Sequence, residues 1–311
     1  PLQALVCYLY LKKNHNIFNN NTTVFFEANH SMPYIEGVKY YSIEDTRIPS
    51  SKIFTRNSEI ILSHISADCN LWVSDLLWQM NNFLYTVLKK RKILISINYF
   101  DEGTITYFNS EQSFKFYFRQ FLKSLYLKIL YCNYTITPKK LFHLGQDNGK
   151  LVALHPKFIS RTKNVFELSP DKDDIEEFLI KFVSSDEIEN TLDIDSKNSA
   201  IILSQPYYRI FDQKYFNILL SKIKSELIIR GIKSLYVKLH PSEKLEDYDR
   251  YYKMHGFKRL NISNQIPFEA LLTKINNNVA ICSVDTSLMF NARKFFFKGK
   301  LYSIGLDYVV K

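Results

Sequence analysis

Cysteine is scarce in this sequence, and its few copies follow no recognisable spacing. The four cysteines, Cys7, Cys69, Cys132 and Cys282, lie far apart and form no Cys-x-x-Cys pair. Disulfide-stabilised secreted domains and zinc-binding modules need cysteines at short, regular spacings. We therefore expect a reduced chain with neither a disulfide framework nor a metal site.

Long apolar runs are missing as well. No stretch approaches the roughly 18 consecutive apolar residues that a membrane-spanning helix needs, and no cleavable signal with a basic start is visible. We expect a cytoplasmic protein, with peripheral contact at the inner face of the cytoplasmic membrane as an alternative placement.

Acidic residues are fewer than basic ones, 31 against 41, and the formal net charge is +10. This charge suits an anionic partner, which can be a nucleotide sugar, an anionic membrane surface or nucleic acid. Charge alone does not choose among the three.

Apolar and aromatic residues are abundant. Hydrophobic residues make up 46% of the 311 positions, with 24 Phe and 21 Tyr, which excludes a disordered chain. The length is about twice that of a typical single domain. We expect two domains, 1–170 and 171–311, joined within the acidic region around 163–196.

The C-terminal half alternates short apolar runs with helical patterns, which is typical of a parallel sheet covered by helices. Apolar residues at helical spacing predict a helix over 212–230, ended by Gly231, and a second helix starts near Pro267. The expected strands are 200–203, 235–239, 258–260 and 278–282.

The N-terminal half is less regular. We expect a buried strand at 93–100, a shorter strand at 59–63 and a long helix at 113–131 that mixes aromatic and basic residues. The long helix is interpreted as a packed element with extended lysine stems. Its alternatives are a dimer contact or a membrane-surface face, and the basic run 89–92 can belong to the same surface.

Polar motifs follow several of the expected strands directly. Ser204-Gln205-Pro206, His240-Pro241 and the segment 283–287 do so in the C-terminal half, and Asp101-Glu102-Gly103 follows the strand at 93–100. Ligands bind at the carboxyl ends of strands in open α/β sheets, so the three C-terminal motifs point to one crevice.

These motifs resemble those of bacterial sialyltransferases. Asp101-Glu102-Gly103 is similar to their motif of two acids and a glycine, Lys238-Leu239-His240-Pro241 to their His-Pro motif, and Thr286-Ser287 to their paired hydroxyls, in the same order. The opening Pro1-Leu2-Gln3-Ala4-Leu5 resembles the start of the lipooligosaccharide sialyltransferases, glycosyltransferase family 52, which are related to other bacterial GT-B sialyltransferases and to polysialyltransferases. The resemblance implies the GT-B fold, in which two Rossmann-like domains face each other across a cleft.

The resemblance also implies an activity. It is the inverting transfer of sialic acid from CMP-sialic acid to a galactose-type hydroxyl of a lipooligosaccharide or capsular glycan, without a metal or other cofactor. The N-terminal domain would bind the acceptor and the C-terminal domain the nucleotide sugar. A homodimer is compatible with it, and nucleic acid is not an expected partner.

Each motif residue receives a role by similarity. Asp101 or Glu102 would be the base that activates the acceptor, and His240 would donate a proton or a hydrogen bond to the departing phosphate. Glu269 would hold the ribose, Lys238 would lie near the cytosine, and Thr286 and Ser287 would bind phosphate oxygens through helix-start amides. Gln205 and Pro241 complete the expected nucleotide-binding set.

Plainer interpretations compete with these roles. Gly103 by itself explains a strand-ending turn, His240 can be an ordinary loop histidine, and Thr286 and Ser287 can simply cap a helix. Asp212 is favoured as a helix cap but is a third candidate for the base. Gln3 is either a binding residue or a structural one.

Two other hypotheses for the function stay open. A glycosyltransferase of the same fold can use a hexose or another acidic sugar, and a non-catalytic basic protein can bind membranes or nucleic acid. The sequence leaves open the acceptor, the linkage, the identity of the base, the donor sugar and the oligomeric state.

Overall fold

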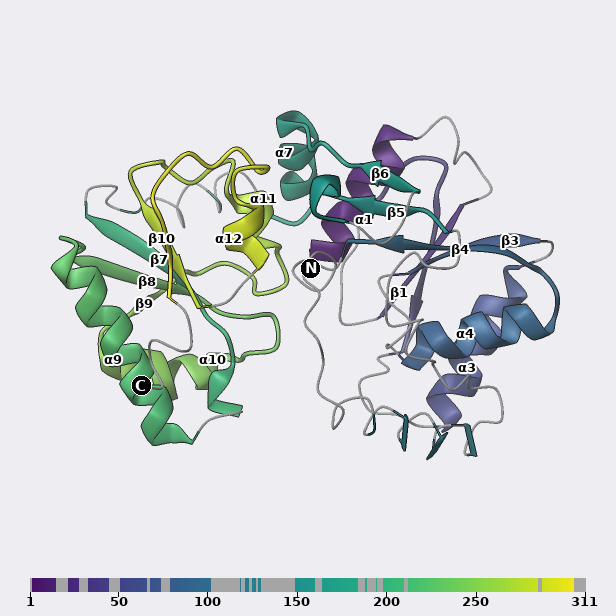
Figure 1. Cartoon of the computed structure of the whole chain (residues 1–311), viewed down its shortest axis with the longest axis horizontal. Coiled ribbons are helices and arrows are strands. Elements are labelled where there is room, and N and C mark those ends of the chain that lie inside the picture. Colours follow the sequence, from purple (N-terminus) through teal and green to yellow (C-terminus); the bar gives the residue numbers. More distant parts are fainter. Residues whose placement is uncertain are drawn as a thin grey trace. The chain divides into compact units, whose positions relative to one another are not determined.

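The computed structural model shows a mixed α/β chain (Figure 1). It divides into two compact units, Leu2–Ser169 and Pro170–Lys311. The structure describes residues 2–14, 22–27, 33–44, 51–65, 68–73, 79–101, 118, 121–122, 125–126, 128–129, 149–159, 164–183, 188, 194, 198–209, 212–284 and 287–304.

The C-terminal unit contains a sheet of five parallel strands in the order β11-β10-β7-β8-β9. The strands expected in this half are confirmed, with starts that differ by at most two residues. Their bounds are β7 (Ser199–Leu203), β8 (Ser234–Lys238), β9 (Lys258–Arg259), β10 (Ala280–Ser283) and β11 (Leu301–Ser303).

Helix α9 (Gln213–Ile229) covers one face of this sheet. Its Phe216 and Leu220 pack against Ile202 and Val237 of the neighbouring central strands. Asp212 caps the amino end, because its Oδ1 accepts the backbone N–H of Tyr215 at 2.9 Å. The predicted helix is therefore confirmed, and the cap explains where it begins.

Shorter helices complete the C-terminal unit. Helix α11 (Phe268–Leu271) begins after Pro267 and buries Ala270 and Leu271, as its pattern predicts. The remaining helices are α7 (Lys172–Ile180), η3 (Tyr207–Arg209), α10 (Leu245–Asp247), η4 (Tyr248–Tyr252), η5 (Lys253–His255) and α12 (Ser287–Asn291).

The N-terminal unit contains a parallel sheet in the order β3-β4-β5-β6 and a separate parallel pair, β1-β2. The predicted strand at 93–100 is β4. The bounds are β1 (Thr23–Glu27), β2 (Lys39–Ile43), β3 (Cys69–Val73), β4 (Leu94–Phe100), β5 (Leu151–Ala153) and β6 (Val165–Glu167), with helices α1 (Leu2–Lys13), α3 (Ser51–Ser63), α4 (Gln79–Lys90) and η2 (Pro156–Phe158).

Aromatic packing joins helix α1 to the N-terminal sheet. The ring of Tyr10 lies 5.0 Å from Trp72 of β3, 5.9 Å from Phe100 of β4 and 5.2 Å from Phe166 of β6, measured between ring centroids. Such edge and tilted pairs stabilise a core beyond the area they bury. They fix the helix over the strand whose end carries Asp101.

The strand predicted at 59–63 is wrong, because these residues form the end of α3. A run of three apolar residues is compatible with either a strand or a buried helix. The helical period decides here, since Phe54 and Ile61 lie on one face of α3 and pack with Phe83 of α4.

The long helix predicted at 113–131 is confirmed at its described positions 118, 121–122, 125–126 and 128–129, which are helical. Their apolar side chains are exposed, from 37% at Leu125 to 69% at Ile129. The expectation that this helix is packed is therefore wrong at these positions. Within the described parts of the chain, no helix is long and apolar enough to cross a membrane.

Candidate active site

The carboxyl ends of β7, β8 and β10 lie side by side, because these strands are neighbours in one parallel sheet. Ser204 directly follows β7, and its N–H donates to the carbonyl of Lys238 at 3.0 Å. The Ser204 hydroxyl in turn accepts the backbone N–H of His240 at 2.6 Å. Within this unit the motifs that follow β7 and β8 are therefore in contact.

His240 is held by the turn that follows β8. Its Nδ1 lies 2.9 Å from the Ser242 hydroxyl and accepts the backbone N–H of Ser242 at 3.2 Å. A backbone N–H can only donate, so Nδ1 carries no proton in this arrangement, and the proton of the neutral ring is on Nε2. The side chain can therefore donate a hydrogen bond from Nε2 to an oxyanion.

The surroundings of His240 favour this neutral ring. Burial, together with the positive charges of Lys238 and Arg209, lowers its pKa from 6.5 to about 4. An anionic ligand beside the ring would act in the opposite sense, because a nearby negative charge favours the imidazolium. The site is thus suited to respond to the arrival of a phosphate.

Lys238 is buried at the end of β8, with only 5% of its surface exposed. Its Nζ donates to the backbone carbonyls of Leu239 and Asn264, both at 3.2 Å. Burial lowers its pKa to about 8, against the opposing effect of the carboxylates of Glu269 and Glu243. In this structure the lysine connects the strand end to the loop before α11.

Glu269 lies in the first turn of α11 and is 7% exposed. Burial raises its pKa, while the positive charge of Lys238 lowers it in part.

The two other residues expected in the nucleotide-binding set use their backbone carbonyls as acceptors. The carbonyl of Pro241 accepts the side-chain amide of Gln265 at 3.3 Å. The half-buried Gln205 uses its carbonyl to accept the N–H of Tyr207 at 2.6 Å.

The acid motif begins at the end of β4 in the other unit. Asp101 is fully buried, its Oδ2 accepts the backbone N–H of Leu154 at 3.1 Å, and its own N–H donates to Val152 at 2.9 Å. Glu102 and Gly103 lie outside the described residues. Asp101 is thus placed as a link between β4 and β5.

The remaining predicted site residues have simpler placements. Asp212 serves as the cap of α9, the role favoured for it from the sequence. Gln3 is half-buried in α1. Ser287 begins α12, and Thr286 lies outside the described residues.

Several residues of this site carry no motif in the sequence. Arg209 of η3 donates to the Ser242 hydroxyl at 3.2 Å and to the Ser242 carbonyl at 2.6 Å, so it contacts the residue that also holds the His240 ring. Glu243 is buried and bonded to Ser204, His240 and Tyr252. The one sequence signal for Glu243 is an acid three residues after the histidine, the spacing at which side chains cap a turn.

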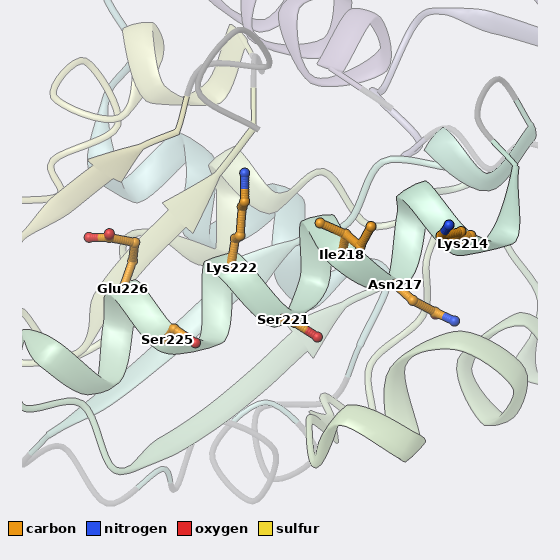
Figure 2. Close-up of a pocket in the computed structure, with 7 residues that line it drawn as sticks. All are labelled: Lys214, Asn217, Ile218, Ser221, Lys222, Ser225 and Glu226. Carbon is orange, nitrogen blue, oxygen red and sulfur yellow. The ribbon is translucent and has the colours of Figure 1, made fainter. Parts of the chain in front are cut away.

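A surface hollow of about 840 Å³ lies elsewhere, along the outer face of α9 (Figure 2). All the residues that line it belong to this one helix: Lys214, Asn217, Ile218, Ser221, Lys222, Ser225 and Glu226. Its lining includes none of the motif residues, so we place the candidate site at the strand ends instead. The described residues contain no group of three or more His, Cys, Asp or Glu side chains that could hold a metal ion.

Solved structures of bacterial sialyltransferases resemble the chain. A 2,6-sialyltransferase of Photobacterium sp. JT-ISH-224, solved with CMP and lactose, is 11% identical, with a TM-score of 0.55 over 98% of this chain and 68% of that one. An alpha/beta-galactoside alpha-2,3-sialyltransferase of Photobacterium phosphoreum is 12% identical, with a TM-score of 0.48 over 96% of this chain and 95% of that one. The GT-B domain of a Photobacterium damselae sialyltransferase is 12% identical, with a TM-score of 0.47 over 93% and 84%.

The first of these likenesses shows the fold, and it confirms the predicted mixed α/β architecture with parallel sheets of the GT-B sialyltransferases. A search of curated protein sequences found no match. The family comparison is more specific, since the model of the family described as alpha-2,8-polysialyltransferase (POLYST) matches residues 9–304. Because this match spans nearly the whole chain, the protein belongs to the alpha-2,8-polysialyltransferase family.

Proposed function

We propose that the protein transfers sialic acid from CMP-sialic acid to a terminal hydroxyl of a bacterial surface glycan, with inversion at the anomeric carbon. The observation that carries the proposal is the polysialyltransferase family match over residues 9–304. The reaction passes through an oxocarbenium-like transition state, so it needs a base for the acceptor hydroxyl and stabilisation of the departing phosphate.

His240 is proposed to act on the departing phosphate. Its Nε2–H is the remaining donor of a ring whose Nδ1 is engaged by Ser242. As the CMP phosphate gains negative charge, it attracts this donor and raises the pKa of the imidazole from about 4. The histidine then contributes a hydrogen bond that strengthens along the reaction, which is the property that lowers a barrier.

Glu102 is the proposed base. Asp101 is fully buried and already accepts a backbone N–H from Leu154, while Asp212 caps α9. A general base must reach the proton that it removes, so the two acids already engaged in these bonds fit the task less well, and Glu102 is the acid of the motif that is left. The proposal rests on this elimination and on the acid motif itself.

Two acceptors are compatible with the proposed reaction. The expected galactose-type hydroxyl of a lipooligosaccharide or capsular glycan is the first, and the family description favours a hydroxyl of a terminal sialic acid as the second. The two are separated by incubating the protein with CMP-sialic acid and either lactose or sialyllactose. A product of one added sialic acid on lactose supports the first, and repeated addition on sialyllactose supports the second.

The same assay tests the donor and the proposed independence from metals. Transfer is expected to continue in excess EDTA and to fail with UDP-hexoses. Absence of both transfer and donor hydrolysis with CMP-sialic acid would contradict the proposal, and transfer from another nucleotide sugar would favour the related glycosyltransferase. Binding to anionic surfaces without any turnover would favour the non-catalytic alternative.

Peripheral membrane contact is a second proposal, on a separate observation. Six large apolar side chains at helical spacing are exposed: Phe118, Phe121, Leu122, Leu125, Tyr126 and Ile129. Exposed Lys128 lies among them, and the chain carries a net charge of +10, which complements anionic lipid. Co-sedimentation with vesicles containing phosphatidylglycerol should fall when Phe118 and Ile129 are changed to Ser, whereas retained binding would contradict this surface.

A further inference from the structure

Glu243 is a buried carboxylate beside the candidate site that the sequence motifs do not account for. It follows His240 by three positions and is only 4% exposed. Its Oε2 accepts the backbone N–H of His240 at 2.8 Å and also the hydroxyl of Ser204, and its Oε1 accepts the hydroxyl of Tyr252 at 2.8 Å. A carboxylate has only acceptor sites, and here three donors use them.

The first of these bonds closes the turn that carries the histidine. The backbone N–H of Glu243 donates to the carbonyl of His240 at 2.9 Å, while the Glu243 side chain accepts the N–H of His240. The two bonds are reciprocal, as in a capping box, so the backbone of the turn is held at both of its ends. Ser242, between these ends, is the residue that orients the imidazole.

The other bonds connect this turn to distant parts of the unit. Ser204 comes from the end of β7, and Tyr252 comes from η4, where it is 1% exposed. The backbone carbonyl of Glu243 also accepts the side-chain amide of Asn264 at 2.9 Å. One residue thus connects a neighbouring strand, a helix and the loop before α11 to the turn of His240.

We infer that Glu243 is the positioning residue of the site, which fixes His240 by accepting hydrogen bonds from His240, Ser204 and Tyr252. The inference rests on the proposed transfer reaction for its catalytic consequence. Displacing a reacting group by about 1 Å can cost about 100-fold in rate, so a residue that holds the turn in place affects turnover without touching substrate.

Two substitutions at Glu243 separate its role as a hydrogen-bond acceptor from its negative charge. In Glu243→Gln, the amide oxygen can accept from both His240 and Ser204, while the amide nitrogen donates to the Tyr252 hydroxyl, which can rotate to accept. This variant keeps the connections and removes the charge. In Glu243→Ala, the hydroxyls of Ser204 and Tyr252 lose this acceptor and the N–H of His240 keeps only its bond to Ser204, which is costly for buried polar groups.

Turnover with CMP-sialic acid should therefore separate the two variants. Glu243→Ala is expected to lower kcat about 100-fold with little change in the KM for the donor, because His240 acts in the transition state. Glu243→Gln should stay within about 5-fold of the wild type and keep its pH profile. Glu246→Ala changes an exposed glutamate three residues further on and is the matched control, with unchanged activity.

Tyr252→Phe provides a milder variant if Glu243→Ala does not fold. It keeps the buried ring and removes one donor, so kcat should fall by about 3-fold to 10-fold at an unchanged KM. A folded Glu243→Ala with wild-type kcat would overturn the inference. A Glu243→Gln variant as inactive as Glu243→Ala would overturn it too, because charge rather than positioning would then be the contribution.

Amide hydrogen exchange provides a readout that does not depend on catalysis. The His240 N–H is bonded to both Ser204 and Glu243, so a peptide covering residues 238–244 should exchange slowly in the wild type. Exchange there should accelerate in Glu243→Ala but stay slow in Glu243→Gln and Glu246→Ala. Unchanged exchange in Glu243→Ala overturns the inference even if its kcat has fallen, whereas failure of the wild type to transfer sialic acid overturns only the proposed function.

Discussion

The two units support their motif residues in different ways. In the C-terminal unit, His240 lies in a turn that is bonded to β7, to η3 through Arg209 and to η4 through Glu243. In the N-terminal unit, Asp101 at the end of β4 is directed into the protein and bonded to the backbone of Leu154. A buried polar network therefore holds the motif histidine in one unit, whereas in the other unit a buried motif acid links two neighbouring strands.

This contrast implies that substitutions in the two units should have different consequences. Changes at His240 should affect turnover and leave the fold intact, because the ring is only half-buried and the turn that carries it is held by other residues. Changes at the two acids of the motif should have different effects, with Asp101 affecting stability and Glu102 affecting turnover.

The largest effect is expected for His240→Ala. Loss of a general acid or of a hydrogen bond to the leaving group typically costs 100-fold to 10,000-fold, so kcat/KM should fall about 1,000-fold. Thermal unfolding should change by only a few degrees, because the imidazole is itself only partly buried. Steady-state kinetics with CMP-sialic acid and a melting curve measure the two quantities.

The matched control is His255→Ala, in the same unit. His255 lies on η5 beside Asn217 and Ser221 of α9, on the face of the sheet that α9 covers. It should retain activity. Full activity in His240→Ala would contradict the assigned role whatever the fold.

The second prediction concerns the adjacent acids, Asp101 and Glu102. Glu102→Gln should lower kcat about 100-fold or more with an unchanged melting temperature, since it removes only the proposed base. Asp101→Asn should destabilise the protein by about 1–3 kcal/mol, because the amide oxygen can still accept the N–H of Leu154 but the new NH2 group places two donors where a fully buried carboxylate oxygen was. Activity per folded molecule should be largely retained in Asp101→Asn, and the reverse pattern would exchange the two roles.

The sequence predicted the C-terminal unit well because its strands β7 and β10 are buried on both faces. Such strands appear as short apolar runs, and the helix at 213–229 shows its periodic Phe216, Leu220 and Ile223 clearly. In the N-terminal unit, β5 and β6 are only three residues each, too short for a pattern, and the run at 59–63 is ambiguous. Tertiary packing decided those elements.

The site was predictable only in part, for a related reason. His240, Lys238 and Glu269 are recognised by motif and order along the chain. Glu243 is harder to recognise from the sequence. Its partner Ser204 is distant in the sequence, at the end of another strand, and its partner Tyr252 is one of 21 tyrosines, so no pattern singles it out. The burial of Asp101 depends in the same way on β5, a strand of three residues that is too short to be recognised in the sequence. Such contacts follow from the assembled sheet.

The third prediction tests the remaining acid of the candidate set. Asp212→Ala removes the cap of α9, so the free energy of unfolding should fall by about 1 kcal/mol. Turnover should not change, because Glu102 and not Asp212 is the proposed base. Asp212→Ser, which can also cap, is the control and should restore most of the stability. A loss of turnover in both variants at normal stability would return Asp212 to the list of bases.

The smallest effect is a pH dependence that belongs to the C-terminal unit. The pKa of His240 is lowered from 6.5 to about 4 in the folded protein, so the unfolded chain binds the extra proton first. Stability from this residue is therefore complete above pH 6.5 and is lost as the pH falls toward 4. Burial raises the pKa of Glu269, which acts in the opposite direction, so only a comparison with a histidine variant isolates the effect.

Between pH 7 and pH 5 the melting temperature of the wild type should fall by a few degrees more than that of His240→Gln. Addition of CMP should reduce this difference, since its phosphate favours the protonated ring. An equal fall in both proteins would show that the neutral imidazole is not a property of this site.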